Sequence, residues 1–355
     1  MKYVIDISKS LIDKVRHILA KGEYDNLSEL IITALENQII LEEGEKIQED
    51  LFSTVVKVPK VGKFNTPKEK KPMDLSKWIS KENLNNIKTY PMPTVNDLEY
   101  PDTTYSDSWL WGQVNRVFPV KVGLRILGNM QQKNSDYIPL RDFQERASEL
   151  ARGFGLQIQR IDAELKRKRN ERFSTALPIG RKEDKAMQRY ISHFLATKRV
   201  GGILDGAMSR LKFVNIKKKN ESPNMIGITE EGLQFMKLRN PLLDESLYSD
   251  KTLSEEEADF YIEHVIKNVP EELNPIYQIL SIINKGISSV SGIDIELKDI
   301  KNEWTDVMVA TQRSGSLGRM IELGLLTKLK DGIKVAYALT EKGKELINRV
   351  KDSNN

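Results

Sequence analysis

The sequence Glu-Leu-Lys, which occurs twice and has the spacing Glu-x-Lys, is the pattern in this chain that comes closest to a catalytic signature. Glu296-Leu-Lys298 follows Asp294, and acidic residues followed by a lysine form the core of metal-dependent nucleases. Glu164-Leu-Lys166 repeats the spacing, which is common in a chain with 55 Lys or Arg and 51 Asp or Glu. The residues around Glu296 have a helical pattern rather than that of a sheet edge. A Mg²⁺-dependent nuclease is therefore the weakest of three functional hypotheses.

The sequence lacks the residues or motifs that several other kinds of catalytic site require. The chain has no cysteine, so disulfides, thiol nucleophiles and Cys-ligated zinc are excluded. His17, His193 and His264 lie far apart and form no HExxH pair, so no catalytic zinc is expected. No GxxxxGK[ST], GxGxxG or GxSxG motif occurs. We expect no enzymatic activity and no cofactor.

The charge is distributed unevenly along the chain, although its net value is only +4. Residues 160–219 contain 17 Lys or Arg against 6 Asp or Glu, and residues 240–300 contain 4 against 13. The basic block indicates a polyanionic partner, and a solvated lysine-rich surface is the alternative. The acidic block is a possible site for a protein partner.

Unpaired buried cations are costly, so the basic block must be solvated or face phosphate. The cations of this block that we expect to contact DNA are Arg160, Lys166, Arg167, Lys168, Arg169, Arg172, Lys217, Lys218 and Lys219. No apolar run approaches the length of a bilayer span, and the N-terminus has no apolar signal-peptide core. The expected location is therefore the cytoplasm, in association with the nucleoid and without a membrane partner.

A motif of the form apolar-Thr-Glu-x-Gly-x-x-apolar occurs twice. It begins at Ile228 and again at Leu339. In each copy we expect the Thr to cap a helix, with the following Glu facing the positive end of the helix dipole. A helix and an extended stretch precede each copy, over 204–212 and 213–228 in the first and over 316–323 and 327–339 in the second. Lys330-Asp-Gly is suited to a hairpin tip. The order helix, hairpin, helix is expected twice.

The first 45 residues are predicted to form a small unit of one strand and two helices. Residues 3–7 alternate as in a half-buried strand, and helical spacing follows in two segments separated by Gly22. One strand and two short helices cannot close a core, so the strand must pair with a copy of itself. A homodimer is expected, with an interface formed by Tyr3, Ile5, Ile7, Leu30, Ile31, Ala34 and Leu35.

The sequences VIDISKSLIDKV and GEYDNLSELIITAL resemble the ribbon-helix-helix family of repressors and antitoxins. The resemblance implies that the paired strands enter the major groove of DNA, with Lys2, Val4 and Asp6 facing the bases. It also implies a backbone phosphate clamp from Asn26 to Ser28. Val4 and Asp6 depart from the usual readers, since neither is a good hydrogen-bond donor to a base. A module that only dimerises is the alternative.

The C-terminal sequence LGRMIELGLLTKL, followed by YALTEKGKELI, resembles the winged-helix regulators of the multiple-antibiotic-resistance and phenolic-acid-regulator type. Helices are expected over 274–285, 295–304 and 311–323. The resemblance implies that the third helix enters the major groove. Its outward residues would be Gln312, Arg313, Ser314, Ser316 and Arg319. Lys328, Lys330 and Lys334 on the wing would contact the flanking backbone. A winged helix kept for packing is the alternative.

The region before it is expected to be a larger unit of the same kind. Helices are predicted over 120–130 and 139–154, and the helix predicted over 182–198 is interpreted as an insertion. Trp109 and Trp111 are expected to dock into the core rather than to stack on bases.

The sequence as a whole predicts a mostly α protein. Its parts are a ribbon-helix-helix module (1–45), a basic Pro/Lys-rich tether (46–104), a winged-helix unit with a basic insertion (105–240) and a second winged-helix unit (254–352). The expected function is that of a dimeric protein that binds double-stranded DNA, as a sequence-specific transcription regulator. A DNA-binding scaffold in plasmid partition, replication or genome defence is the second hypothesis.

Overall fold

A computed structural model describes residues 109–134, 137–168, 171–198, 204–217, 224–331 and 334–353, together with Ile87. The predicted N-terminal module, with Lys2, Asn26, Ser28 and the expected dimer interface, lies outside the described residues, as do Arg169, Lys218 and Lys219. The chain divides into two compact units, Met1–Met73 with Lys166–Arg172, and Asp74–Leu165 with Phe173–Asn355. The second, larger unit includes almost all of the described residues.

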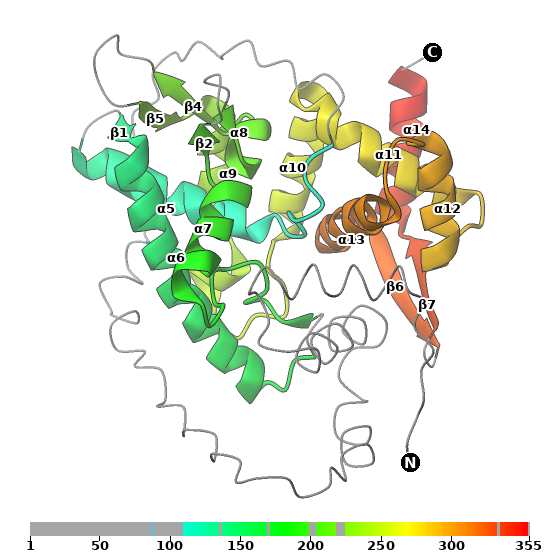
Figure 1. Ribbon diagram of the computed structural model, residues 1–355, viewed down its shortest axis with the longest axis horizontal. Helices are drawn as coiled ribbons and strands as arrows, with labels where there is room; N and C mark the ends of the chain where they lie inside the picture. Colours follow the sequence, from blue (N-terminus) through cyan, green and yellow to red (C-terminus); the bar gives the residue numbers. More distant parts are fainter. Residues whose placement is uncertain are drawn as a thin grey trace, which may run out of the picture. The chain divides into compact units, whose positions relative to one another are not determined.

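The larger unit is mostly helical, with small antiparallel sheets, as expected from the sequence (Figure 1). Its α-helices are α5 Phe118–Asn134, α6 Leu140–Glu164, α7 Glu183–His193, α8 Ala207–Arg210, α9 Glu230–Lys237, α10 Glu255–Asn268, α11 Pro270–Asn284, α12 Val290–Ile300, α13 Asp306–Glu322 and α14 Glu341–Ser353. Its strands are β1 Ile138–Pro139, β2 Thr197–Lys198, β3 Leu204–Asp205, β4 Val214–Lys217, β5 Met225–Ile228, β6 Leu326–Asp331 and β7 Lys334–Leu339.

The first half of this unit, residues 109–238, contains α5 to α9. Strands β4 and β5 form the predicted hairpin, and β1 pairs with the other edge of β5. The helix predicted over 204–212 was too long, because β3 pairs with β2 and leaves only α8 helical. The helix predicted over 182–198 ends at His193 for the same reason, since β2 follows it.

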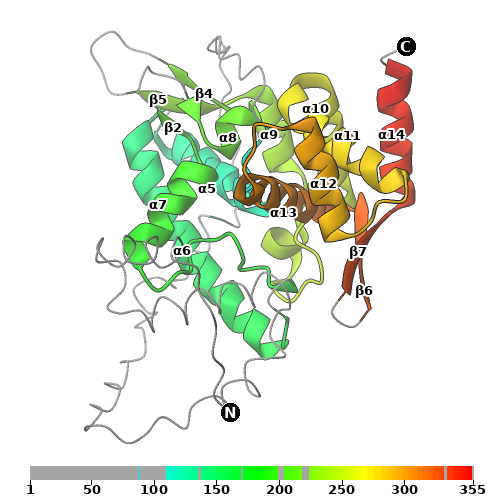
Figure 2. The same ribbon diagram turned by 45° about the vertical axis from the view of Figure 1, so that its right-hand side comes forward.

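The second half, residues 270–353, repeats this order. Helix α11 is followed by a single bridge between Ser289 and Ala336, then by α12, α13, the hairpin β6–β7 and α14. In both halves the second strand of the hairpin is paired along both of its edges. Strand β5 pairs with β4 and with β1, which precedes α6. Strand β7 pairs with β6 and, at Ala336, with Ser289, which precedes α12. Helices α7 and α8 together occupy the place in the order that α13 has in the second half. The hairpin β6–β7 extends beyond the helices (Figures 1 and 2).

The repeated Thr-Glu-x-Gly motif forms the same local structure in both halves. Thr229 accepts a hydrogen bond from Gly232 N and donates one to Lys212 O, at 3.1 and 2.8 Å. Thr340 accepts one from Gly343 N and donates one to Gly324 O, at 3.1 and 2.7 Å. The predicted helix caps are therefore confirmed, and each Thr also fastens its cap to the turn before the hairpin.

Both motif glycines are required by a close approach of the backbone. A Cβ atom on Gly232 would overlap the carbonyl oxygen of Phe213, and one on Gly343 would overlap that of Leu325. The residue before each carbonyl has a left-handed conformation, with φ of 57° at Lys212 and 73° at Gly324. The two halves thus share a turn, a cap and a helix start.

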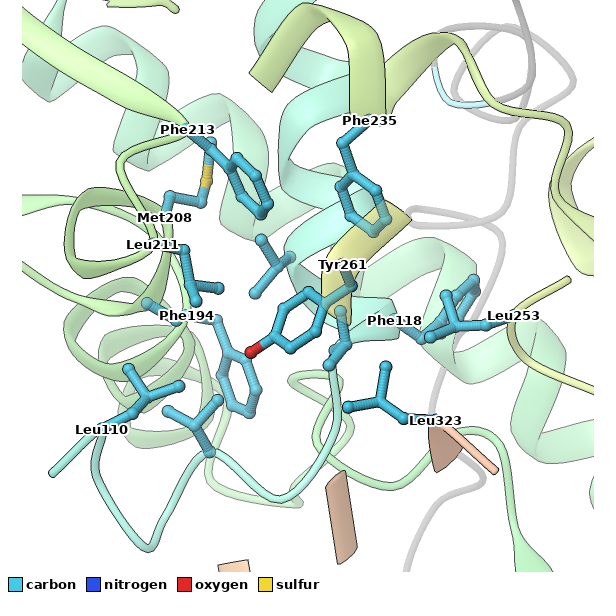
Figure 3. Packing of buried hydrophobic residues seen from close by; sticks show 14 of the residues in the cluster. Leu110, Phe118, Phe194, Met208, Leu211, Phe213, Phe235, Leu253, Tyr261 and Leu323 are labelled. Atoms are coloured by element: carbon cyan, nitrogen blue, oxygen red, sulfur yellow. The ribbon is translucent and has the colours of Figure 1, made fainter. Parts of the chain in front are cut away.

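The two halves share one continuous hydrophobic core. Tyr261 of α10 is fully buried and lies between Phe235 of the first half and Leu323 of the second (Figure 3). Trp109 packs edge-on against Trp304 with ring centroids 4.8 Å apart, which confirms that it docks in the core. The regions predicted as separate domains, 105–240 and 254–352, therefore lie in one compact unit.

Buried ion pairs connect the first half to the segment that follows it. Lys121 of α5 contacts Glu257 of α10 at 2.8 Å, with both side chains fully buried. Burial lowers the pKa of Lys121 to about 8, although Glu257 acts in the opposite direction. Arg125 makes two hydrogen bonds to Asp244, at 2.9 and 2.8 Å. A buried charge that loses its partner is strongly destabilising, so these pairs tie the fold of α5 to residues 244–257.

In the part of the chain that the structure describes, no helix is both long enough and apolar enough to cross a membrane.

Candidate nucleic-acid interface

The clearest basic surface of the larger unit lies on α7 and the two residues before it. Arg181, Lys182, Lys185, Gln188 and Arg189 are all exposed. Lys185 and Arg189 are four residues apart and Gln188 lies between them, so the three share one side of the helix. The acidic residues of α7, Glu183 and Asp184, are confined to its first turn, at the positive end of the helix dipole.

The opposite side of α7 is fixed to the core. The buried Tyr190 hydroxyl donates to Pro119 O at 2.9 Å, at the start of α5. Gly123 of α5 leaves no room for a Cβ atom, because Leu195 and Met208 pack against it. The His193 ring packs edge-on against Trp111 at 5.2 Å, and Arg210 lies over Trp111 at 5.4 Å. Helix α7 therefore presents its basic side on a rigid support.

The loop that leads into α7 is held by two side chains of α6. Buried Asp162 accepts hydrogen bonds from Phe173 N, Ser174 N and Ser174 Oγ, at 3.1, 3.0 and 2.7 Å. Buried Arg152 donates to Pro178 O and Gly180 O at 2.6 and 3.1 Å, and burial lowers the pKa of Arg152. The chain is thus anchored immediately before Arg181 and Lys182.

The basic loop Lys166–Arg172 belongs to the other compact unit. Lys166 and Lys168 are exposed, and Arg167 and Arg172 are half-buried. Lys166 has a positive φ of 51°, and Arg172 Nε donates to Arg167 O at 3.3 Å. The predicted cation Arg160, on the last turns of α6, is exposed as expected.

One further exposed cation, Lys198 of β2, lies next to the start of β5. Lys198 of β2 donates to Asn224 Oδ1 at 3.1 Å, immediately before β5. Lys217 is the last residue of β4. Lys198 was not among the predicted site residues.

Helix α13 of the second half, which was predicted to be the major-groove helix, is approached closely by another segment of the chain. A Cβ atom on Gly315 would overlap the carbonyl oxygen of Gly112, and one on Gly318 would meet that of Asn115. The segment 109–117 therefore covers one side of α13. On the first turn of α13 Asp306, Val307 and Met308 are exposed, and none of them is a cation.

The prediction that Arg319 faces outward from α13 was wrong. Its guanidinium is buried and bonds both carboxylate oxygens of Glu272, at 2.7 and 2.8 Å. It also donates to the carbonyl groups of Trp111 and Val114. Ser316, which was also expected to face outward, is buried. Arg319 therefore joins α13, α11 and the segment 109–117.

The other predicted DNA contacts of the second half are accessible to different degrees. Gln312 and Arg313 are half-buried, and Arg313 pairs with Asp294 at 2.8 Å. Ser314 is exposed, as are Lys328, Lys330 and Lys334 on the hairpin β6–β7. The hairpin lysines are exposed, whereas Arg313 is half-buried and engaged with a carboxylate.

The residues of the nuclease hypothesis lie on α12, a helix, as the sequence indicated. The Lys298 ammonium group contacts Asp306 at 3.0 Å and the Trp304 carbonyl group. Within the described part of the chain, no group of three or more His, Cys, Asp or Glu residues could hold a metal ion.

Sequence reasoning missed the exposed cations Arg181, Lys182, Lys185 and Arg189. They lie within the basic block that the charge count identified, but α7 was interpreted as an insertion. The available signal was the spacing of Lys182, Lys185 and Arg189, which repeats every three or four residues.

Comparison of the chain with protein-family models, with curated proteins and with solved structures finds no match.

Proposed function

We propose that this chain is a dimeric, non-catalytic DNA-binding protein in which the first half makes the principal contact with duplex DNA. Both halves would be winged helices, and α7 would be the major-groove helix of the first. The observation that carries the proposal is the exposed basic side of α7, a helix whose other side is fixed to the core. Helix α7 is the third helix of the first half, after α5 and α6. Arginine and glutamine are suited to guanine and adenine edges, and lysine to phosphates.

The sequence-specific regulator is the first form of this proposal. Gln188 and Arg189 would read bases, while Lys182, Lys185 and Arg181 would neutralise phosphates. Dimerisation through residues 1–45, as the ribbon-helix-helix resemblance implies, would place two such helices on one DNA molecule and raise the affinity through effective concentration. The loop Lys166–Arg172 and the lysines of the β4–β5 hairpin would add phosphate contacts of their own.

The scaffold is the second form, and a specific observation favours it. The segment 109–117 covers one side of helix α13, and the Arg319 guanidinium is hydrogen-bonded to Glu272. A winged helix with its third helix covered is better suited to packing or to a protein partner than to reading DNA. One half would then bind DNA and the other would assemble proteins on it.

The test is a mobility-shift titration of duplex DNA that compares the full wild-type chain with its K185A/R189A variant. The slope of log K against log salt is negative, and each phosphate contact that is lost makes it less steep by about 0.9. We therefore expect the slope of the variant to be less steep by about one to two units. We expect an affinity for random duplex at least 10-fold weaker at low salt. K251A/K344A is the matched control, because it removes two exposed cations elsewhere, each paired with a neighbouring carboxylate.

Wild-type affinity and salt slope in K185A/R189A would show that α7 is not the DNA contact. Binding of the wild-type chain to the DNA upstream of its own gene separates the two forms. A strong preference over random duplex supports the regulator, and equal binding supports the scaffold. Cleavage of either DNA in Mg²⁺ would contradict the non-catalytic part of the proposal.

A further inference from the structure

The exposed side of the α12–α13 pair combines large apolar side chains with acidic ones. Ile295 on α12 is 62% exposed and Val307 on α13 is 76% exposed, whereas residues of these types are usually buried. Ile300 and Met308, on the same two helices, are each 44% exposed. Exposed apolar side chains that lie together on one face often mark an interaction site, so the positions of Ile295 and Val307 relative to each other matter here.

Two ion pairs show that Ile295 and Val307 lie on the same side of the helix pair. Asp294 contacts Arg313 at 2.8 Å and Lys298 contacts Asp306 at 3.0 Å, so the two helices run antiparallel. The next residue on each helix is turned by about 100° from the contact line. Because the two helices run in opposite directions, these two rotations turn the next residue of each helix toward the same side of the pair. Ile295 and Asp299 on α12 therefore share a face with Val307 and Ser314 on α13.

The charges beside this face are acidic. Asp299, Glu303 and Asp306 are exposed, and the side chain of Asp306 is 97% exposed. The same segment contains two lysines: the Lys298 ammonium group is engaged by Asp306 and the Trp304 carbonyl, and Lys301 at the end of α12 is half-buried. Such a face repels DNA phosphates. A second copy of the chain docked through the same face would bring these acidic groups together, which is also unfavourable.

We propose that the α12–α13 face binds a protein partner through a basic amphipathic helix. Apolar side chains of such a helix would cover Ile295 and Val307, and its lysines or arginines would pair with Asp299, Glu303 and Asp306. This inference does not depend on the proposal that α7 binds DNA. A basic partner fits a DNA-bound scaffold, because proteins that assemble on DNA commonly carry basic segments.

The experiment measures binding of a fluorescent 18-residue peptide with leucine and lysine at helical spacing to the full chain, by anisotropy. We expect micromolar binding that falls at least 10-fold in I295S/V307S and at least threefold in D299N/D306N. The matched control is Y248S/L329S, which removes two exposed apolar side chains elsewhere, 58% and 50% exposed. All six substituted positions are exposed, so the three variants should keep the wild-type melting temperature.

Two further peptides test the chemistry of the partner. A serine and lysine peptide should bind at least 10-fold more weakly, and a leucine and glutamate peptide should not bind. Equal binding of the serine and lysine peptide, or wild-type binding by I295S/V307S, would overturn the proposal. A change of oligomeric state in I295S/V307S, measured by sedimentation, would also overturn it by making the face a contact between copies. DNA affinity of I295S/V307S should equal that of the wild type, which keeps this test separate from the one on α7.

Discussion

The two threonine caps show how a short repeated motif can specify a turn. In each half the hydroxyl group accepts from the helix and donates to the turn before the hairpin, while the glycine three residues later allows a carbonyl group to approach. These contacts connect the helix after the hairpin to the residues before it. The motif therefore holds the hairpin closed at its base.

Substitutions in the motif should have similar effects in the two halves. Loss of a helix cap costs about 1 kcal/mol, so T229A and T340A should each lower the free energy of unfolding by that amount or more, because a second bond is also lost. T229S and T340S, which keep the hydroxyl group, are the controls. G232A and G343A should be more damaging, because the methyl group would overlap a carbonyl oxygen. Urea unfolding measures all six, and a neutral G343A would show that the close approach does not occur.

Arg319 illustrates what the sequence alone could not predict at this scale. Leu317 and Met320 were correctly expected to face inward, and Arg319 was placed on the outer side of the same helix. The expectation failed because α13 has partners on a second side, where the segment 109–117 covers it. That segment lies about 200 residues earlier in the chain, and helical periodicity gives no information on such a contact. The repeated motif, by contrast, is local, so its caps were predictable.

At the scale of the elements, the entry into α7 depends on Asp162. Its carboxylate accepts from two backbone amides and one hydroxyl group where the chain leaves the basic loop Lys166–Arg172. Removal of this carboxylate should free Phe173 and Ser174 without changing the charge of the loop itself.

We predict that D162A makes the loop more sensitive to trypsin, which cleaves after its lysines and arginines. The initial rate of cleavage within residues 166–172 should rise at least fivefold, as local opening becomes more favourable. D184A is the control, because Asp184 is exposed on the first turn of α7. Equal rates for D162A and the wild type would mean that Asp162 does not anchor the loop.

Most long elements were predictable from their apolar spacing, and the short ones were not. Helices α5, α6, α11, α12 and α13 and both hairpins lie where the pattern placed them, with ends that differ by several residues. Strands β1, β2 and β3 have two residues each, too few for a period. Helix α10 lies at the start of the predicted unit 254–352, but no individual helix was predicted there. Helix α7 was expected, but its role depends on tertiary position, which the spacing does not give.

At the scale of the whole molecule, His264 connects α10 to the end of α8. Asn268 Nδ2 donates to His264 Nδ1 at 3.1 Å, so Nε2 carries the proton and donates to Leu211 O at 2.7 Å. The ring stacks on Phe213 with centroids 4.7 Å apart. Burial lowers the pKa of His264 below its ordinary value of 6.5, so the folded protein favours the neutral ring.

This contribution to stability should depend on pH. Above 6.5 the ring is neutral in both states and its bonds stabilise the fold. As the pH falls below 6.5 the unfolded chain takes up a proton that the folded chain resists, so the stabilisation declines. The difference in free energy of unfolding between wild type and H264F should therefore be largest near pH 7.5 and smaller at pH 5.5. Urea unfolding at the two values measures it, and a constant difference would contradict a neutral, buried His264.

The buried pairs of α5 have a consequence for the order in which the protein can be made. Lys121 and Arg125 leave the ribosome well before their partners Glu257 and Asp244, and the interval is roughly ten seconds at ordinary rates of synthesis. During that interval the first half cannot close its core without burying two uncompensated charges. The nascent chain must therefore wait, open to chaperones and proteases, until the acidic segment arrives. We therefore expect that a chain truncated after the basic block would not fold. Such an unfolded fragment would be open to degradation, so a cationic protein without its second half would not accumulate.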